Sequence, residues 1–217
     1  MFRLIRPESE PWLDVARPSP TDADRAAGQL RADYERWSRW ALGLGGFVSA
    51  AGGLFTAVGV VTTAYALDRG VALIDVVAVT IAGAVGLAGT AVLVMLWRSG
   101  RRLTRGAAQW IRVPYLLSGR SRTARGWLKA RTVNVEPRIL VRLATSTAAL
   151  LLAVAGISAA VRDVVTETST VTYAAAAVGV LALLSGLGQL GGVLRIVSGL
   201  GEADPLWHRI RTSFRAE

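Results

Sequence analysis

Long apolar runs dominate the chain and alternate with arginine-rich segments. An uncharged run covers residues 41–66, and three further apolar segments cover 71–97, 139–161 and 171–194. At about 1.5 Å per residue, each is long enough to cross a hydrocarbon core of about 30 Å. The pattern predicts an all-α integral membrane protein with four transmembrane helices in two antiparallel hairpins.

Short polar turns at 67–70 and 162–170 separate the paired segments, so each pair must return antiparallel. Longer segments lie before, between and after the pairs. The predicted regions are a cytoplasmic N-terminal segment (1–40), transmembrane hairpin 1 (41–97), a basic cytoplasmic connector (98–138), transmembrane hairpin 2 (139–194) and a cytoplasmic tail (195–217).

An amphipathic pattern precedes the first apolar run. Apolar residues recur at three- and four-residue spacing, and charged residues occupy the other positions. This predicts a cytoplasmic amphipathic helix from Thr21 to Trp40 that continues into the first transmembrane helix. The apolar face contains Ala23, Ala27, Leu30, Tyr34, Trp37 and Ala41, and the polar faces contain Arg31, Asp33, Glu35, Arg36 and Arg39.

The connector carries many basic residues and a single acidic one, Glu136. Its first half has the pattern of a helix lying in the membrane interface, which we expect to end at Pro114. Arg142, near the inner end of the third apolar segment, is expected to extend toward lipid headgroups. Lipid or partner contacts are predicted for Arg101, Arg102, Arg105, Trp110, Arg112, Trp127 and Lys129.

Basic residues are distributed very unevenly around the apolar segments. The chain has 25 Lys and Arg residues, and only Arg69 and Arg162 lie in the two short turns, which leaves 25 − 2 = 23 elsewhere. Because basic residues near span ends stay on the cytoplasmic side, both termini are predicted to be cytoplasmic. The abundance of Ala, Gly and Val, and of Arg over Lys, is typical of a GC-rich bacterial genome, so we expect a multi-pass protein of the bacterial plasma (inner) membrane.

The net charge of +10 has several explanations. Trp110 and Trp127 lie among arginines and could stack on nucleic-acid bases. The adjacent spans, however, hold the connector within reach of anionic headgroups. We therefore expect membrane lipids as partners, together with other membrane subunits or further copies of this chain, and no nucleic acid.

Small residues recur every four positions in the apolar segments and predict close helix packing. Gln189 is the large polar side chain within a span and is expected to hydrogen-bond to another helix. The residues predicted to pack helices together are Gly45, Ser49, Gly53, Gly86, Gly188, Gln189 and Gly192.

Candidate chemistry is sparse. The chain has no cysteine and one histidine, His208, which excludes disulfides, Cys-ligated metals and bis-histidine haem. Asp75 lies near an outer end, where water or Arg69 can satisfy it. We predict no cofactor, no metal and no enzymatic activity.

Two functions remain. The first is a non-catalytic membrane subunit, a scaffold or accessory component of a larger bacterial envelope complex. The alternative is a homo-oligomeric pore or small transporter, in which hydroxyl side chains such as Ser49, Thr56 and Thr62 would line a polar path.

Overall fold

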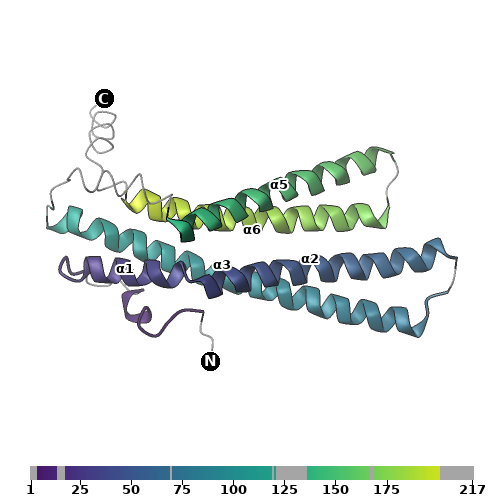
Figure 1. The fold of residues 1–217 in the computed structure, drawn as a ribbon, viewed down its shortest axis with the longest axis horizontal. Helices are drawn as coiled ribbons and strands as arrows, with labels where there is room; N and C mark the ends of the chain where they lie inside the picture. Colours follow the sequence, from purple (N-terminus) through teal and green to yellow (C-terminus); the bar gives the residue numbers. More distant parts are fainter. Residues whose placement is uncertain are drawn as a thin grey trace. The chain divides into compact units, whose positions relative to one another are not determined.

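The computed structural model describes residues 4–13, 18–68, 70–118, 120, 136–166 and 169–200. Over these ranges the regular structure is entirely helical (Figure 1). The prediction of an all-α protein is therefore confirmed for this part of the chain. A short 3-10 helix, η1 (Glu10–Trp12), precedes α1 (Ala23–Tyr34), α2 (Trp37–Ala66), α3 (Leu73–Leu117), α5 (Pro137–Thr166) and α6 (Thr170–Leu200).

Four helical stretches are long and apolar enough to cross a membrane, as the hydropathy pattern predicts. They are Ala23–Ala66, which contains α1 and α2, and the helices α3, α5 and α6. Large apolar side chains on these helices, including Phe55, Leu87 and Leu151, are exposed. Such a surface is compatible with a multi-pass membrane protein, because lipid would cover it.

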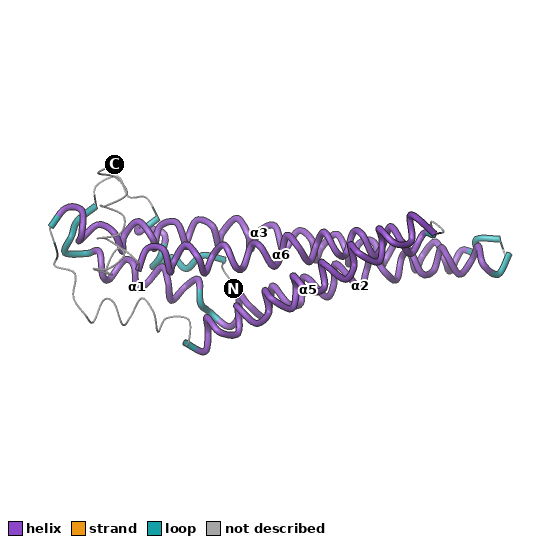
Figure 2. The backbone as a smooth tube through the Cα atoms, turned by 90° about the horizontal axis from the view of Figure 1, so that it is seen from above, coloured by secondary structure: helices purple, strands orange, loops and turns teal. Residues whose placement is uncertain are grey.

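Helix α3 is longer than expected. Its 45 residues span about 68 Å, more than twice the thickness of a hydrocarbon core. The prediction of a separate interfacial helix after Trp97 is wrong, because α3 continues through this point without a break (Figure 2). Pro114 lies inside the helix, which ends at Leu117. Residues 98–113 contain no proline, so nothing in the backbone ends the helix earlier.

The predicted continuous helix from Thr21 into the first span is also interrupted. Helix α1 ends at Tyr34, with Glu35 as its C-cap, and α2 begins at Trp37. The N–H of Glu35 donates to the carbonyl of Arg31, so the last turn of α1 is closed normally. The break places Arg36 between two helices.

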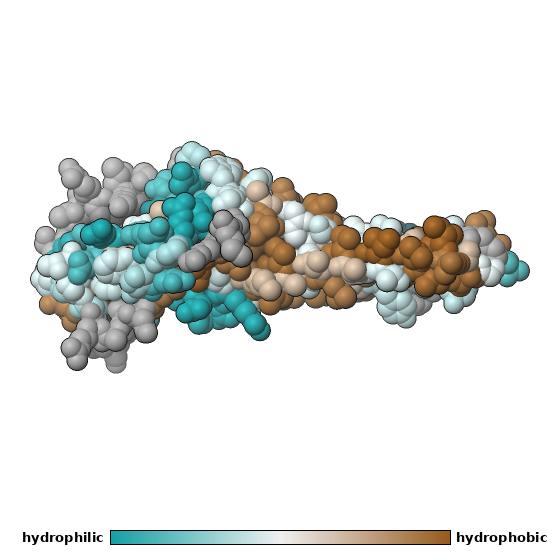
Figure 3. Space-filling view, turned by 90° about the horizontal axis from the view of Figure 1, so that it is seen from below, coloured by the Kyte–Doolittle hydropathy of each residue, from teal (hydrophilic) through white to brown (hydrophobic). Residues whose placement is uncertain are grey.

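The chain forms two compact units. The arginine-rich unit comprises Met1–Arg39, Trp97–Leu143 and Gln189–Glu217, and the apolar unit comprises Trp40–Leu96 and Ala144–Gly188. Hydrophilic side chains gather over the first and hydrophobic side chains over the second (Figure 3). Of the 25 basic residues, Arg69 and Arg162 belong to the apolar unit, and the other 23 belong to the arginine-rich unit.

Close backbone contacts pack α2 against α3 and α5 against α6 in the apolar unit. A Cβ built on Gly53 of α2 would lie 2.5 Å from the carbonyl oxygen of Ala82 and 2.6 Å from the nitrogen of Gly86 in α3. A Cβ on Gly156 of α5 would lie 2.9 Å from the carbonyl oxygen of Ala175 in α6. Only glycine allows these helix backbones to approach so closely.

The arginine-rich unit has its own hydrophobic core, built from α1, α3, α5 and α6. Leu30 of α1, Leu103 of α3, Ile139 of α5 and Ile196 of α6 are all fully buried in it. Trp110 joins them and meets Trp12 edge to face, with ring centroids 5.8 Å apart. The residues of α1 on the expected apolar face, Ala23, Ala27, Leu30 and Tyr34, are buried, whereas Trp37, expected on the same face, is 48% exposed.

Candidate functional site: a buried arginine cluster

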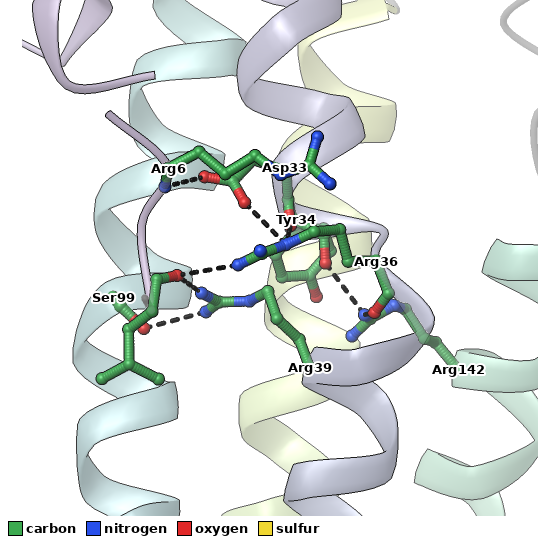
Figure 4. A network of polar contacts seen from close by, with 8 residues as sticks. Arg6, Asp33, Tyr34, Arg36, Arg39, Ser99 and Arg142 are labelled. Atoms are coloured by element: carbon green, nitrogen blue, oxygen red, sulfur yellow. Dashed lines mark hydrogen bonds and ion pairs between the residues drawn. The ribbon is translucent and has the colours of Figure 1, made fainter. Parts of the chain in front are cut away.

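A network of polar contacts surrounds the break between α1 and α2 (Figure 4). We call it the junction cluster. Its members are Asp33, Tyr34, Arg36, Arg39, Ser99 and Arg142, all in the arginine-rich unit.

Arg39 is the most enclosed arginine of the junction cluster, with 4% of its surface exposed. One terminal nitrogen donates to Ser99 Oγ at 2.8 Å, and the other donates to the backbone carbonyl of Leu4. Arg39 therefore connects the start of α2 to α3 and to the N-terminal segment.

Asp33 is 1% exposed and supplies the negative charge at the centre of the cluster. Its Oδ2 accepts a hydrogen bond from the backbone N–H of Arg6 at 2.9 Å. Its Oδ1 forms an ion pair with Nε of Arg36 at 2.8 Å. A buried carboxylate is tolerated only with such partners, and here they fix the N-terminal segment against α1.

Arg142 of α5 is 7% exposed and donates hydrogen bonds to carbonyls at the end of α1. It donates to the carbonyl of Tyr34 at 2.8 Å and contacts the carbonyl of Arg36 at 3.4 Å. The last carbonyls of a helix lack intrahelical partners, and a cation there also interacts favourably with the helix dipole. Arg142 thus compensates for the helix break.

Tyr34 lies between Arg142 and α6. The guanidinium of Arg142 is 4.6 Å from the centre of its ring, within the range of a cation–π interaction. A Cβ built on Gly192 would overlap the Tyr34 hydroxyl and lie 2.9 Å from Cζ of the ring. The ring can occupy this position only because residue 192 is glycine.

Further ion pairs surround the junction cluster. Arg31 pairs with Glu35 one turn later, at 2.5 Å, and with Glu136, the residue that precedes α5. Arg120 pairs with Asp24 through two hydrogen bonds of 2.9 and 2.7 Å, and these bonds raise the pKa of Arg120. Arginine suits these positions because its planar fork offers several donors.

The side chains of the junction cluster bind other groups of the same chain. The donors named above go to backbone carbonyls, a hydroxyl and a carboxylate of the same unit. They connect the N-terminal segment, the α1–α2 break, α3 and α5. The cluster can therefore hold these elements in a fixed arrangement. No group of three or more His, Cys, Asp or Glu residues within the described ranges could hold a metal ion.

Four predictions about charged residues here are wrong. Asp33, Glu35 and Arg39 were expected on polar faces, and Arg142 was expected to reach toward headgroups, but all four are buried. The break after Tyr34 turns Arg39 inward, and the carbonyls released by the same break accept from Arg142. An Arg at the polar start of a span resembles a headgroup anchor, so the sequence carried no signal for these roles.

The connector residues predicted to contact lipid or a partner fall into different environments. Trp110 is 4% exposed and donates from Nε1 to the carbonyl of Trp12 at 2.8 Å, so its ring belongs to the core of the arginine-rich unit. Arg102 and Arg105 are exposed, and Arg101 and Arg112 are partly exposed. Trp127 and Lys129 lie outside the described residues.

The residues predicted to pack helices together are also placed differently. Gly53 and Gly86 face each other across α2 and α3, and Ser49 lies 3.0 Å from the position of a Cβ on Gly89. A Cβ on Gly45 would meet nothing within 4 Å, and Gly192 faces Tyr34. Gly188 and Gln189 are partly exposed in α6, and Gln189 has a contact partner.

Together these observations define a helical protein with four stretches able to span a membrane and an arginine-rich unit organised by buried guanidinium groups. No protein-family model, curated protein or solved structure is significantly similar to the chain.

Proposed function

We propose that the chain is a non-catalytic subunit of the bacterial plasma membrane, a scaffold or accessory component of a larger envelope complex. The four helical stretches would form two antiparallel hairpins across the bilayer. The arginine-rich unit, with both termini, would lie in the cytoplasm and present a folded surface to a partner.

The charge distribution supports this placement. The arginine-rich unit holds 23 of the 25 basic residues, whereas the apolar unit holds Arg69 and Arg162. Basic residues flanking spans stay in the cytoplasm during insertion. The basic residues that flank the four apolar stretches therefore fall almost entirely in the arginine-rich unit, as expected if that unit is the cytoplasmic part.

The observation that carries the proposal is the use of buried arginines to build a module. Arg39 and Arg142 donate hydrogen bonds to backbone carbonyls, and Arg39 also donates to Ser99. The surrounding helices share a hydrophobic core of their own. A chain that needed its cytoplasmic segments only as connections would have no reason to bury charges there, which is costly. A rigid module is what a docking partner requires.

Four threonine hydroxyls of the apolar unit also favour a scaffold over a pore. Thr62, Thr63, Thr80 and Thr90 each donate to the carbonyl four residues earlier in their own helix, and the Thr62 hydroxyl also meets that of Thr170 at 2.6 Å. Such bonds to the helix backbone are common for threonine in apolar helices. These four hydroxyls therefore have partners within the protein and need no aqueous path.

Co-purification from native membranes in mild detergent tests the proposal, with identity and stoichiometry read by mass spectrometry. We expect a partner in fixed ratio to the chain. Deletion of 101–131 would remove the buried residues Leu103, Ala107 and Trp110, so the informative variant replaces only 121–135 by a Gly-Ser linker of equal length. This variant should lose the partner and keep the unfolding temperature of the wild type.

The matched control is the double variant Arg69→Gln, Arg162→Gln, which removes charge from the opposite side and should keep the partner. Recovery of the wild-type chain alone, as a homo-oligomer of defined size, would contradict the scaffold and favour the pore. Flux through liposomes containing the purified protein would then be measured.

A further inference from the structure

Three arginines from two helices converge on one face of the arginine-rich unit. They are Arg101 and Arg105 of α3 and Arg195 of α6, and the positive charges of Arg101 and Arg105 both act on Arg195. No acidic partner for any of the three occurs within the described ranges. Like charges brought together in this way destabilise a fold unless an anion joins them.

The register of α3 and α6 explains the convergence. A Cβ built on Gly199 would lie 3.2 Å from Cα of Ala108, so these two positions are adjacent. Glycines 100 and 192 both lie beside Tyr34, which sets the same register two turns earlier. The two helices therefore run in parallel through this unit, and Arg195 lies opposite the turn between Arg101 and Arg105.

Two of the guanidinium groups fold back toward the apolar ends of their helices. The guanidinium of Arg101 lies 4.9 Å from the ring centre of Trp97, one turn earlier. A terminal nitrogen of Arg195 lies 4.0 Å from the position of a Cβ on Gly191, also one turn earlier. Helical side chains lean toward the N-terminus, and in both helices the residues in that direction are the apolar ones.

Arg101 is also held in place. Its Nε is buried and has no hydrogen-bond partner among the described residues, and its guanidinium carbon lies over the Trp97 ring. A guanidinium group offers several N–H donors and can bind two oxygens of a phosphate group.

We propose that Arg101, Arg105 and Arg195 form a binding site for the phosphate of an anionic phospholipid headgroup. Tryptophans mark membrane interfaces, and Trp97 follows directly on the apolar part of α3, which ends at Leu96. The folded-back guanidinium groups therefore lie at the depth of the headgroups. Arg195 thus joins the connector residues that the sequence indicates, whereas Trp110 is buried and does not belong to the site.

The site rests on the membrane placement proposed above and not on a protein partner. Failure to co-purify a partner would leave it intact, and loss of lipid binding would leave the scaffold intact. The two proposals can therefore fail separately.

Binding of short-chain phosphatidylglycerol to the full chain in neutral detergent tests the site, measured by native mass spectrometry and by the shift in unfolding temperature. We expect one lipid per chain. The double variant Arg101→Gln, Arg195→Gln should weaken binding about 30-fold, from about fivefold for each basic residue near an anionic surface. It should unfold no earlier than wild type without lipid, because it removes repulsion.

The matched control is the double variant Arg25→Gln, Arg138→Gln, which removes two exposed charges from the same unit. Neither residue is among the charges that act on Arg195, so without a charged bilayer this variant should change binding less than threefold. If the site variant fails to fold, the exposed single variant Arg105→Gln should weaken binding about fivefold.

Equal losses of lipid binding in the two double variants would overturn the site, because nonspecific electrostatic attraction would then explain the binding. Binding of phosphatidylcholine as tight as that of phosphatidylglycerol would overturn it as well. Inorganic phosphate is the third probe. Binding of inorganic phosphate as tight as that of the lipid would show an anion site and overturn its assignment to a headgroup.

Discussion

Arg142 shows how a single buried cation can replace the backbone hydrogen bonds that a broken helix loses. It reaches from α5 to the carbonyls of Tyr34 and Arg36, and its guanidinium carbon lies over the Tyr34 ring. Guanidinium suits this position because it is flat, always charged and rich in donors. The charge is stabilised by what it contacts, so the residue is structural.

Replacing Arg142 by leucine should therefore destabilise the fold. The carbonyls of Tyr34 and Arg36 would lose a charged donor in a buried place, and we expect a loss of about 2–4 kcal/mol in the free energy of unfolding. Arg138→Leu, one turn earlier and exposed, should change it by less than about 0.5 kcal/mol. Denaturant unfolding in detergent measures both, and equal effects would refute the capping role.

Gly192 offers a second test at a neighbouring contact. An added methyl group would overlap the hydroxyl of Tyr34, whose ring is held by Arg142, so Gly192→Ala should destabilise by about 1–3 kcal/mol. At Gly191 the nearest atom would be 4.0 Å away, so Gly191→Ala should be neutral or stabilising by up to about 1 kcal/mol.

Adding Tyr34→Phe to Gly192→Ala should restore part of the loss, because the overlapping hydroxyl is removed while Cζ remains at 2.9 Å. The same unfolding measurement applies. If Tyr34→Phe restored nothing, the clash would lie elsewhere.

The helices differ from the sequence-based expectations at their ends. Apolar runs locate the four spans, because burial in lipid requires about 20 apolar residues and leaves a strong pattern. The continuation of α3 beyond Trp97 leaves no such pattern, since polar residues continue a helix as well as apolar ones do. The break after Tyr34 contains neither Gly nor Pro and depends on contacts from α5, which are distant in the sequence.

Packing between α2 and α3 should be sensitive to added volume at one glycine and not at its neighbour. A Cβ on Gly53 would lie 2.5 Å from a backbone oxygen of α3, whereas one on Gly52 would meet nothing within 4 Å. Gly53→Ala must push the helices apart and should cost about 1–3 kcal/mol. Gly52→Ala should be neutral or slightly stabilising in the same thermal unfolding experiment in detergent. The reverse order would show that the helices pack through other faces.

Over the whole chain, two kinds of residue differ in how well the sequence predicts their environment. Lipid-facing apolar runs and the unequal distribution of arginine can be read without a structure, because each is a local property of the sequence. The junction cluster could not be predicted, because it depends on which arginines turn inward. Arg39 and Arg98 look alike in the sequence, yet the first is buried against Ser99 and the second is exposed.

Both proposals require the arginine-rich unit to lie in the cytoplasm and the short turns of the apolar unit to face outward. The natural chain has no cysteine, so single engineered cysteines report position without background. Arg25 and Asp68 are exposed residues, one in each unit, and suit this purpose.

Labelling of Arg25→Cys and Asp68→Cys with a membrane-impermeant thiol reagent is therefore the most direct measurement. The Asp68→Cys variant should react in intact cells with the outer barrier opened, and Arg25→Cys only after the plasma membrane is permeabilised. Labelling of Arg25→Cys from outside, or of both variants from the same side, would contradict the placement on which the scaffold and the headgroup site depend.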